Sequence, residues 1–159
     1  MNEPFKLEKM LWTDVDFDTM SWHDNPIHGF CFDKDFKFYL DIDYIFRWVK
    51  TKNGKHFKFW ISPCTLVFEN VYDFKMEEDN PSDLVILAVE RDNAKVPRNV
   101  EFIKKDTEYD WLIETLHGEM TFTSVGFKQY VRSQPVLIGN QIIELSKRGG
   151  VSFDTTISK

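Results

Sequence analysis

The stretch FKFYLDID at residues 36–43 decides the fold, because its apolar and polar side chains alternate with a period of two. Such alternation predicts a β-strand with one buried side and one solvent-facing side. The buried side would carry Phe36, Phe38, Leu40 and Ile42, and the solvent-facing side would carry Lys37, Asp41 and Asp43.

Asn53-Gly54 marks the next reversal of the chain and is the strongest short signal of a β-hairpin. We expect a type I′ turn there, which requires positive φ at both central residues. This turn fixes a register that separates apolar from polar side chains. The predicted cross-strand pairs are Phe46 with Ile61, Arg47 with Trp60 in a cation–π contact, Trp48 with Phe59, and Val49 with Lys58.

A second hairpin is predicted at His117-Gly118, with Ile113 facing Phe122 and Thr115 facing Met120. Residues 5–12 are expected to form a short helix, and the acid-rich residues 75–83 an exposed loop. Further runs with strand character are residues 29–33, 64–69, 83–90, 127–132, 141–145 and 151–153.

The composition agrees with a β fold. Ala88 and Ala94 are the only alanines, whereas the chain holds 15 Phe, 5 Trp and 5 Tyr, and aromatic residues suit a half-buried pleated surface. A chain of 159 residues is of ordinary size for one domain. We therefore expect an all-β or mainly β domain over residues 1–159, either an antiparallel barrel-like sheet or a two-layer sandwich, with at most a short helix.

Charge and hydropathy exclude several classes of protein. The formal net charge of -6 argues against affinity for duplex nucleic acid or anionic membranes. No apolar run reaches the ~18 residues of a membrane span, and the first residues lack the layout of a signal peptide. We expect a cytoplasmic protein with Cys31 and Cys64 reduced. No glycine-rich phosphate loop is found, and we expect no cofactor.

One candidate site for chemistry lies near the N-terminus. Imidazole and carboxylate groups suit a divalent transition metal, and the candidate ligands are His23, Asp24, His28 and Asp41, with Asp43 beside them. His23 and Asp24 are also the candidates for acid–base catalysis in a small metal-dependent enzyme. The competing interpretation is a turn with local hydrogen bonds, since the spacing matches no established metal motif.

A second candidate is the basic, aromatic hairpin at residues 44–61. It carries Arg47, Lys50, Lys52, Lys55 and Lys58 and no acidic residue. Basic and aromatic side chains together can bind single-stranded nucleic acid, with Arg47, Lys55, Lys58 and Trp60 as the candidate contacts. The alternative is that the lysines protect an exposed hairpin from edge-to-edge pairing.

The distribution of charge along the chain favours a third function. Residues 14–43 carry eight Asp against Lys34 and Lys37, so an acidic segment precedes the basic hairpin. An acidic face on a small rigid domain can steer a basic protein partner into a specific complex. We therefore expect a non-catalytic binding module for a protein partner, comparable by charge with the immunity proteins of bacterial toxin systems.

Several segments together resemble a family of small, uncharacterised bacterial proteins. They are SWHD (21–24), IHGF (27–30), LDIDYI (40–45) with Trp48, FWISPCTLVFENV (59–71), GFKQYVR (126–132) and RGGVSF (148–153). The resemblance implies a bacterial, cytoplasmic, single-domain protein. It implies no reaction and assigns no catalytic residue.

Overall fold

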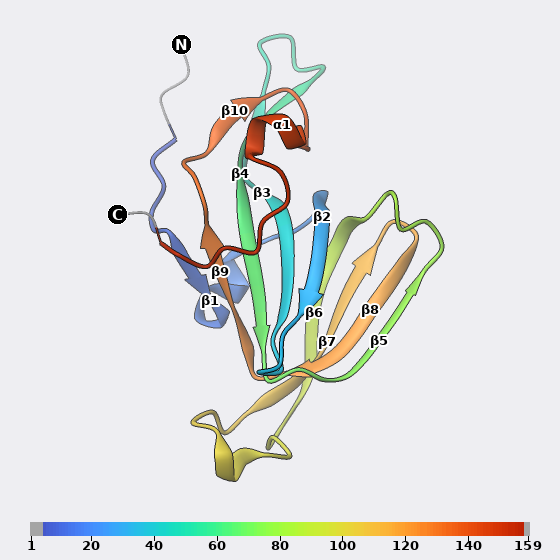
Figure 1. Cartoon of the computed structure of the whole chain (residues 1–159). Coiled ribbons are helices and arrows are strands. Elements are labelled where there is room, and N and C mark those ends of the chain that lie inside the picture. Colours follow the sequence, from blue (N-terminus) through green and yellow to red (C-terminus); the bar gives the residue numbers. More distant parts are fainter. Residues whose placement is uncertain (1–4, 158–159) are drawn as a thin grey trace.

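The computed structural model describes residues 5–157, and its regular structure is almost entirely β (Figure 1). The strands are β1 (Leu11–Thr13), β2 (Asn25–Phe32), β3 (Phe38–Lys50), β4 (Phe57–Glu69), β5 (Tyr72–Glu78), β6 (Val85–Lys95), β7 (Glu108–Thr115), β8 (Gly118–Ser124), β9 (Gly126–Val131) and β10 (Val136–Ile138). The helices are the 3-10 turns η1 (Asp14–Thr19) and η2 (Val100–Phe102) and the single-turn α1 (Leu145–Arg148). Among the described residues, no helix is both long and apolar enough to cross a membrane.

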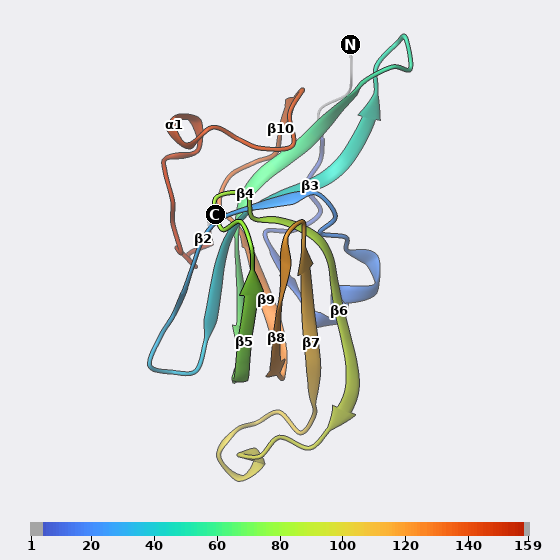
Figure 2. The same ribbon diagram turned by 90° about the vertical axis from the view of Figure 1, so that its right-hand side faces the viewer.

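All ten strands form one antiparallel sheet in the order β1-β9-β4-β3-β2-β6-β7-β8-β5, with β10 added to β4. β2 joins the two halves of the sheet, because its first residues pair with β6 and the rest of the strand pairs with β3. The sheet folds back on itself, so that β5–β8 lie opposite β4 and β9 (Figure 2). The predicted all-β antiparallel fold is confirmed, and the sheet does not close into a barrel.

Aromatic rings fill the space between the two halves of the sheet. Phe68 of β4 lies with its ring centroid 4.8 Å from Phe122 of β8 and 5.1 Å from Trp111 of β7. Phe38 of β3 contacts Phe122 at 5.6 Å, and all four side chains are at most 3% exposed. Edge-to-face contacts of this kind add to the free energy gained by burying the rings. The aromatic content that predicts the β fold therefore builds its core.

The β3–β4 hairpin has the predicted register at its outer end. Arg47 pairs with Trp60, Trp48 with Phe59 and Val49 with Lys58. The predicted pair of Phe46 with Ile61 is wrong, because the register shifts between Ile45 and Arg47 and Ile61 pairs with Ile45. The type I′ turn is also wrong: of the two central residues only Gly54 has positive φ (66°), and the backbone of Thr51 bonds to that of His56 across a longer loop.

The predicted register of the β7–β8 hairpin is wrong by two residues. Ile113 pairs with Met120 and Trp111 pairs with Phe122, so the reversal falls at Leu116-His117. The same side chains still face the core, because a shift of two residues preserves the side of the sheet. Gly118 begins β8, where a Cβ atom would lie 1.9 Å from the carbonyl oxygen of Glu77 in β5. This glycine permits close strand packing.

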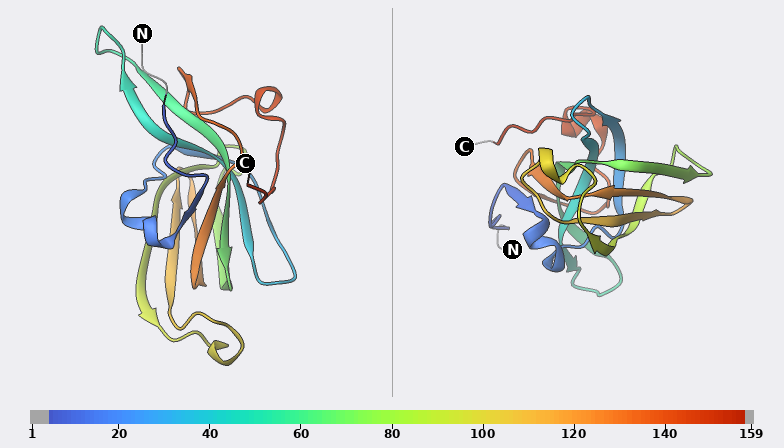
Figure 3. Two further views of the ribbon diagram at one scale, coloured as in Figure 1. Left: turned by 90° about the vertical axis from the view of Figure 1, so that its left-hand side faces the viewer. Right: turned by 90° about the horizontal axis from the view of Figure 1, so that it is seen from below.

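Several predictions at the ends of the chain are wrong. Residues 5–10 form no helix, and β1 follows them as a short edge strand. Residues 141–145 and 151–153 form no strands, because the C-terminal segment leaves the sheet after β10 and crosses its outer side through α1 (Figures 1 and 3).

The predicted loop at residues 75–83 begins later than expected, since Lys75 to Glu78 belong to β5.

Candidate functional site

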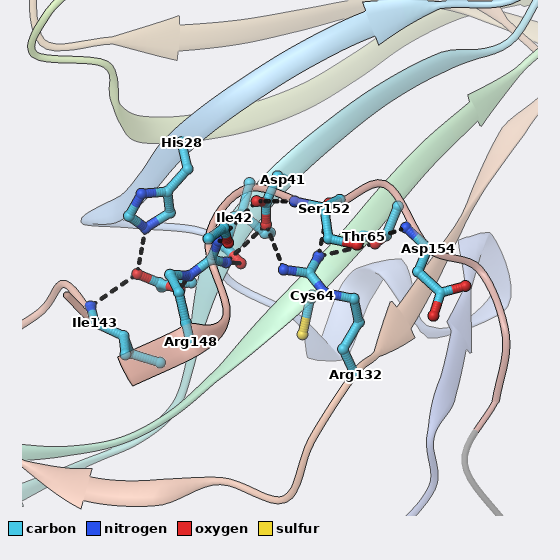
Figure 4. Close-up of polar contacts among 12 residues, drawn as sticks. His28, Asp41, Ile42, Cys64, Thr65, Arg132, Ile143, Arg148, Ser152 and Asp154 are labelled. Atoms are coloured by element: carbon cyan, nitrogen blue, oxygen red, sulfur yellow. Dashed lines mark hydrogen bonds and ion pairs between the residues drawn. The ribbon is translucent and has the colours of Figure 1, made fainter. Parts of the chain in front are cut away.

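The solvent-facing side predicted for β3 is buried. Asp41 and Asp43 are both 0% exposed, although each points away from the aromatic core. The C-terminal segment covers them, and Figure 4 shows Arg148 and Arg132 approaching Asp41 from different sides. Two carboxylates at 0% exposure require partners, because burial of an isolated charge is very costly.

Arg148 binds both carboxylates. Its Nη1 and Nη2 atoms donate to the two oxygens of Asp41, each at 2.7 Å, and its Nε atom donates to Asp43 Oδ1 at 3.0 Å. The backbone carbonyl oxygens of Gly150 and Ile42 accept further bonds from the same guanidinium, at 2.8 and 3.3 Å. The planar fork of arginine suits this two-sided contact, which a lysine could not reproduce.

The remaining carboxylate positions are also filled. Asp41 accepts hydrogen bonds from Arg132 Nη2 at 2.8 Å and from the backbone N–H of Ser152 at 2.9 Å. For Asp43, the backbone N–H of Ile143 donates at 2.8 Å, and His28 Nε2 lies 2.6 Å from the same oxygen. We call this set the carboxylate clasp: His28, Asp41, Asp43, Arg132 and Arg148.

Asp41 and Arg148 stabilise each other's ionised forms. Burial alone would raise the pKa of Asp41, but hydrogen bonds from Arg148 and Ser152 and the charge of Arg132 outweigh it, so that the pKa lies below its ordinary value of 3.8. Burial would likewise lower the pKa of Arg148, and the two carboxylates more than reverse that effect. A cluster in which both carboxylates are paired in this way positions the C-terminal segment on β3.

The predicted metal ligands are not brought together. Asp41 and His28 belong to the clasp, where guanidinium groups occupy the position next to the carboxylates that a cation would need. His23 and Asp24 lie in a turn closed by a backbone bond from Asn25 to Trp22, as the local-turn interpretation expects. Among residues 5–157, no group of three or more His, Cys, Asp or Glu side chains is arranged to hold a metal ion.

The candidate acid–base pair has structural contacts instead. His23 Nδ1 lies 3.0 Å from the carbonyl oxygen of Leu87, and its Nε2 lies 3.4 Å from Asp24 Oδ2. That same oxygen of Asp24 accepts a hydrogen bond from Gln141 Nε2 at 3.0 Å. The pair therefore ties the turn to β6 and to the C-terminal segment.

Among the candidate contacts on the basic hairpin, Arg47, Lys55 and Lys58 are exposed, and Arg47 and Trp60 also contact another part of the chain. Arg47 and Trp60 are cross-strand partners, but the guanidinium of Arg47 lies over the ring of Phe5 at 5.1 Å, and Trp60 contacts the same ring at 6.0 Å. The predicted cation–π contact thus forms with Phe5, a residue far away in the sequence.

An acidic surface that the sequence analysis missed covers the outer side of β5–β8. Alternate residues of the four strands point outward there and form rows across the sheet. We define this acidic face as Asp73, Glu77, Glu90, Asp92, Asp110, Glu114 and Glu119, together with Lys75, Leu112, Thr121 and Thr123. The signal was present as acidic positions alternating with core residues, but it is spread over four strands that only the fold aligns.

On the acidic face, residues of like charge lie directly opposite one another on neighbouring strands. Glu119 of β8 is the cross-strand neighbour of Glu77 in β5 and of Glu114 in β7, and Asp92 of β6 is the cross-strand neighbour of Asp110 in β7. Directly opposed like charges destabilise a sheet. Two carboxylates of the face form ion pairs, Asp110 with Lys95 and Asp73 with Arg98. Within residues 5–157, the other five carboxylates of the face form no ion pair: Glu77, Glu90, Asp92, Glu114 and Glu119.

The face is also hollowed. A cavity of about 770 Å³ opens along Glu90, Asp92, Asp110 and Glu119, and its lining also includes Leu112, Thr121 and the cations Lys75, Arg91 and Lys95. A neighbouring hollow of about 330 Å³ is lined by Glu77, Glu114 and Glu119, among others. Glu77, Glu114 and Glu119 have no ion-pair partner among residues 5–157, and no Lys or Arg lines this second hollow, so it suits a cationic side chain.

Comparisons with known proteins assign no function to these surfaces. No protein-family model matches the chain, and neither a curated protein nor a solved structure matches it. The resemblance to small bacterial proteins therefore stays a prediction, and no residue role is taken from a relative.

Substitution of Arg148 tests the clasp. Arg148→Met would leave Asp41 and Asp43 buried without their shared partner, and losing one member of a buried ion pair costs about 3–5 kcal/mol. Urea denaturation should show a loss of this size, and limited proteolysis should cut first in the C-terminal segment. Lys147→Met, at a side chain that is 74% exposed, is the matched control and should stay within about 0.5 kcal/mol of the unmodified protein. A loss of less than about 1 kcal/mol for Arg148→Met would contradict the structural role.

The pKa of Asp41 predicts loss of stability in acid. Because the pKa is lower in the folded chain than in the unfolded chain, the ionised carboxylate stabilises the fold fully above about pH 4. That contribution is lost as the pH falls from there through the folded pKa. A carboxyl-carbon NMR titration should give Asp41 a midpoint below 3.8, and a midpoint at or above this value would rule out the paired state.

Removal of one charge from the acidic face should stabilise the protein. Glu119→Gln relieves repulsion from both Glu77 and Glu114, and each like-charged pair costs roughly 0.2–1 kcal/mol. The free energy of unfolding should rise at low salt, and the gain should shrink in about 1 M NaCl. Glu144→Gln, whose nearest ion-pair partner Lys147 is 4.0 Å away, should show no such gain. If the Glu119→Gln protein is less stable than the unmodified protein at low salt, Glu77, Glu119 and Glu114 do not repel one another.

Proposed function

We propose that this chain is a non-catalytic binding module whose acidic face binds a basic surface of a protein partner. The observation that carries the proposal is the row formed by Glu77, Glu119 and Glu114, three adjacent carboxylates without an ion pair among the described residues. A row that costs stability in the free protein becomes favourable when cations of a partner neutralise it.

Charge supports fast and specific association. Five unpaired carboxylates on one side of the molecule create a negative field that extends about 8–10 Å into physiological salt. Such a field steers a basic partner toward the face and disfavours acidic competitors. Of the four cations beside these carboxylates, Lys95 and Arg98 already have partners in Asp110 and Asp73, whereas Lys75 and Arg91 form no ion pair among the described residues. The seven carboxylates of the face outnumber them, so the row of Glu77, Glu119 and Glu114 stays negative.

Shape supports the same partner. Lys and Arg side chains combine an apolar stem with a charged end, and the hollow over Leu112 and Thr121 offers both kinds of contact. The strands beneath the face are fixed by the aromatic core, so the backbone that carries the carboxylates is already ordered before binding and little backbone entropy is lost. By charge, this favours a role comparable with that of the immunity proteins of bacterial toxin systems.

A comparison of three baits tests the proposal. Tagged unmodified protein, a face variant (Glu77→Gln, Glu114→Gln, Glu119→Gln) and a control variant (Asp18→Asn, Glu101→Gln, Glu144→Gln) would be incubated with lysate of the native host at low salt. Both variants lose three negative charges, and the control positions are exposed residues outside the acidic face. A basic protein should be recovered in stoichiometric amount by the unmodified and control baits only.

The affinity of the recovered partner then decides the outcome. The face variant should bind at least tenfold more weakly at low salt, with a smaller difference at high salt, and the control variant should change affinity little. Recovery of no stoichiometric partner, or equal binding by the two variants, would overturn the proposal.

A further inference from the structure

The β3–β4 hairpin forms a second surface of opposite charge. Its outer part extends beyond the body of the molecule (Figures 2 and 3). No acidic residue occurs between Asp43 and Glu69, and the hairpin carries five cations in a chain of net charge -6. These cations are all exposed: Arg47, Lys50, Lys52, Lys55 and Lys58.

Two aromatic rings are left exposed among these cations. Trp48 is 41% exposed and Phe57 is 39% exposed, with their ring centroids 5.6 Å apart at an interplanar angle of 80°. Phe59 supports Trp48 from below at 4.8 Å, so the indole is held in place while part of it stays open to solvent. Protection of a bare hairpin edge explains the lysines but leaves the exposed rings without a role.

A hollow of about 560 Å³ lies beside these rings. Trp48, Phe57 and Phe59 line one side, and residues 139–141 of the C-terminal segment line another. Lys55, Lys58 and Asn140 also line it, which places cations and an amide around an aromatic wall. The volume falls in the range of about 300–1,000 Å³ that small-molecule sites occupy, enough for one base with its sugar.

We propose that this hairpin binds a short segment of single-stranded nucleic acid. An unpaired base stacks on Trp48 in the hollow, its polar edge faces Asn140, and Lys55 and Lys58 contact the flanking phosphates. A duplex does not fit this scheme because its bases are already stacked and its two charged backbones meet the acidic body of the protein. An acidic peptide would satisfy the lysines but supplies no partner for the two rings.

This inference is independent of the proposed function. It uses the hairpin and residues 139–141, which share no residue with the acidic face. Either surface can therefore fail its test without affecting the other.

The test is a fluorescence-anisotropy titration with fluorescein-labelled ten-nucleotide oligo(dT) and oligo(rU), at about 25 mM salt. The logarithm of the binding constant should fall with the logarithm of the salt concentration along a slope of about -1.4, as expected when Lys55 and Lys58 contact two phosphates of a single strand. Trp48→Ala and Phe57→Ala should each weaken binding about tenfold, because base–aromatic stacking is sensitive to loss of the ring. The ratio of the affinities for oligo(dT) and oligo(rU) tells whether the unmodified protein prefers DNA or RNA.

Two controls separate stacking from charge. Phe102→Ala removes an aromatic ring that is 85% exposed and lies outside the hairpin, and it should leave binding unchanged. Unlabelled poly-glutamate of equal charge should compete far more weakly than unlabelled oligo(dT). The proposal is overturned by the absence of binding at low salt, by ring variants that bind as well as the unmodified protein, or by poly-glutamate that competes as well as the oligonucleotide.

Discussion

The bond between Arg148 and the two buried aspartates of β3 is the interaction on which the outer side of the sheet depends. Without this bond, the burial of Asp41 and Asp43 at 0% exposure would be very costly, and the C-terminal segment would lose its charged contact with β3. Once anchored, that segment places Ile138 and Ile143 against Ile45. β10, which pairs with residues 59–61 of β4, brings residues 139–141 beside the β3–β4 hairpin, where they line the hollow at Trp48.

Buried ion pairs are weak sources of net stability but strong sources of specificity, because an alternative packing would leave their charges unpaired. Here they select one path for a segment with little regular structure. α1 is a single turn, and residues 151–157 have no strand partner. The hydrogen bonds of Ile143 and Ser152 to the aspartates replace the ladder that a strand would have supplied. The clasp thereby does for this segment what strand pairing does for the rest of the chain.

The strands were predictable from local patterns, whereas the clasp was not. Alternation at residues 36–43 placed Phe38, Leu40 and Ile42 correctly in the core, but it was wrong for Phe36, which precedes β3 and is 54% exposed. The same alternation assigned Asp41 and Asp43 to solvent, because a period of two separates sides of a strand but does not tell what covers the polar side. Their partner Arg148 lies more than 100 residues away in the sequence, in a stretch with no periodic pattern.

The two candidate binding surfaces also differ in how far they could be predicted from the sequence. The basic hairpin is local in sequence, so both its cations and most of its register could be predicted. Two of the eight aspartates at residues 14–43 are neutralised inside the clasp, so this segment is less negative than its sequence indicates. The acidic face needed the alignment of β5–β8, because Glu77, Glu114 and Glu119 become neighbours only across strands.

Native-state hydrogen exchange of the backbone amides tests the central role of the clasp most directly. If the bonds to Asp41 and Asp43 hold the C-terminal segment, the amides of Ser152 and Ile143 should exchange as slowly as those of the central strands β3 and β4. Their protection should also fall together with the stability of the whole protein as urea is added. Fast exchange of both amides, insensitive to urea, would contradict the account, because the segment would then open without disturbing the sheet it covers.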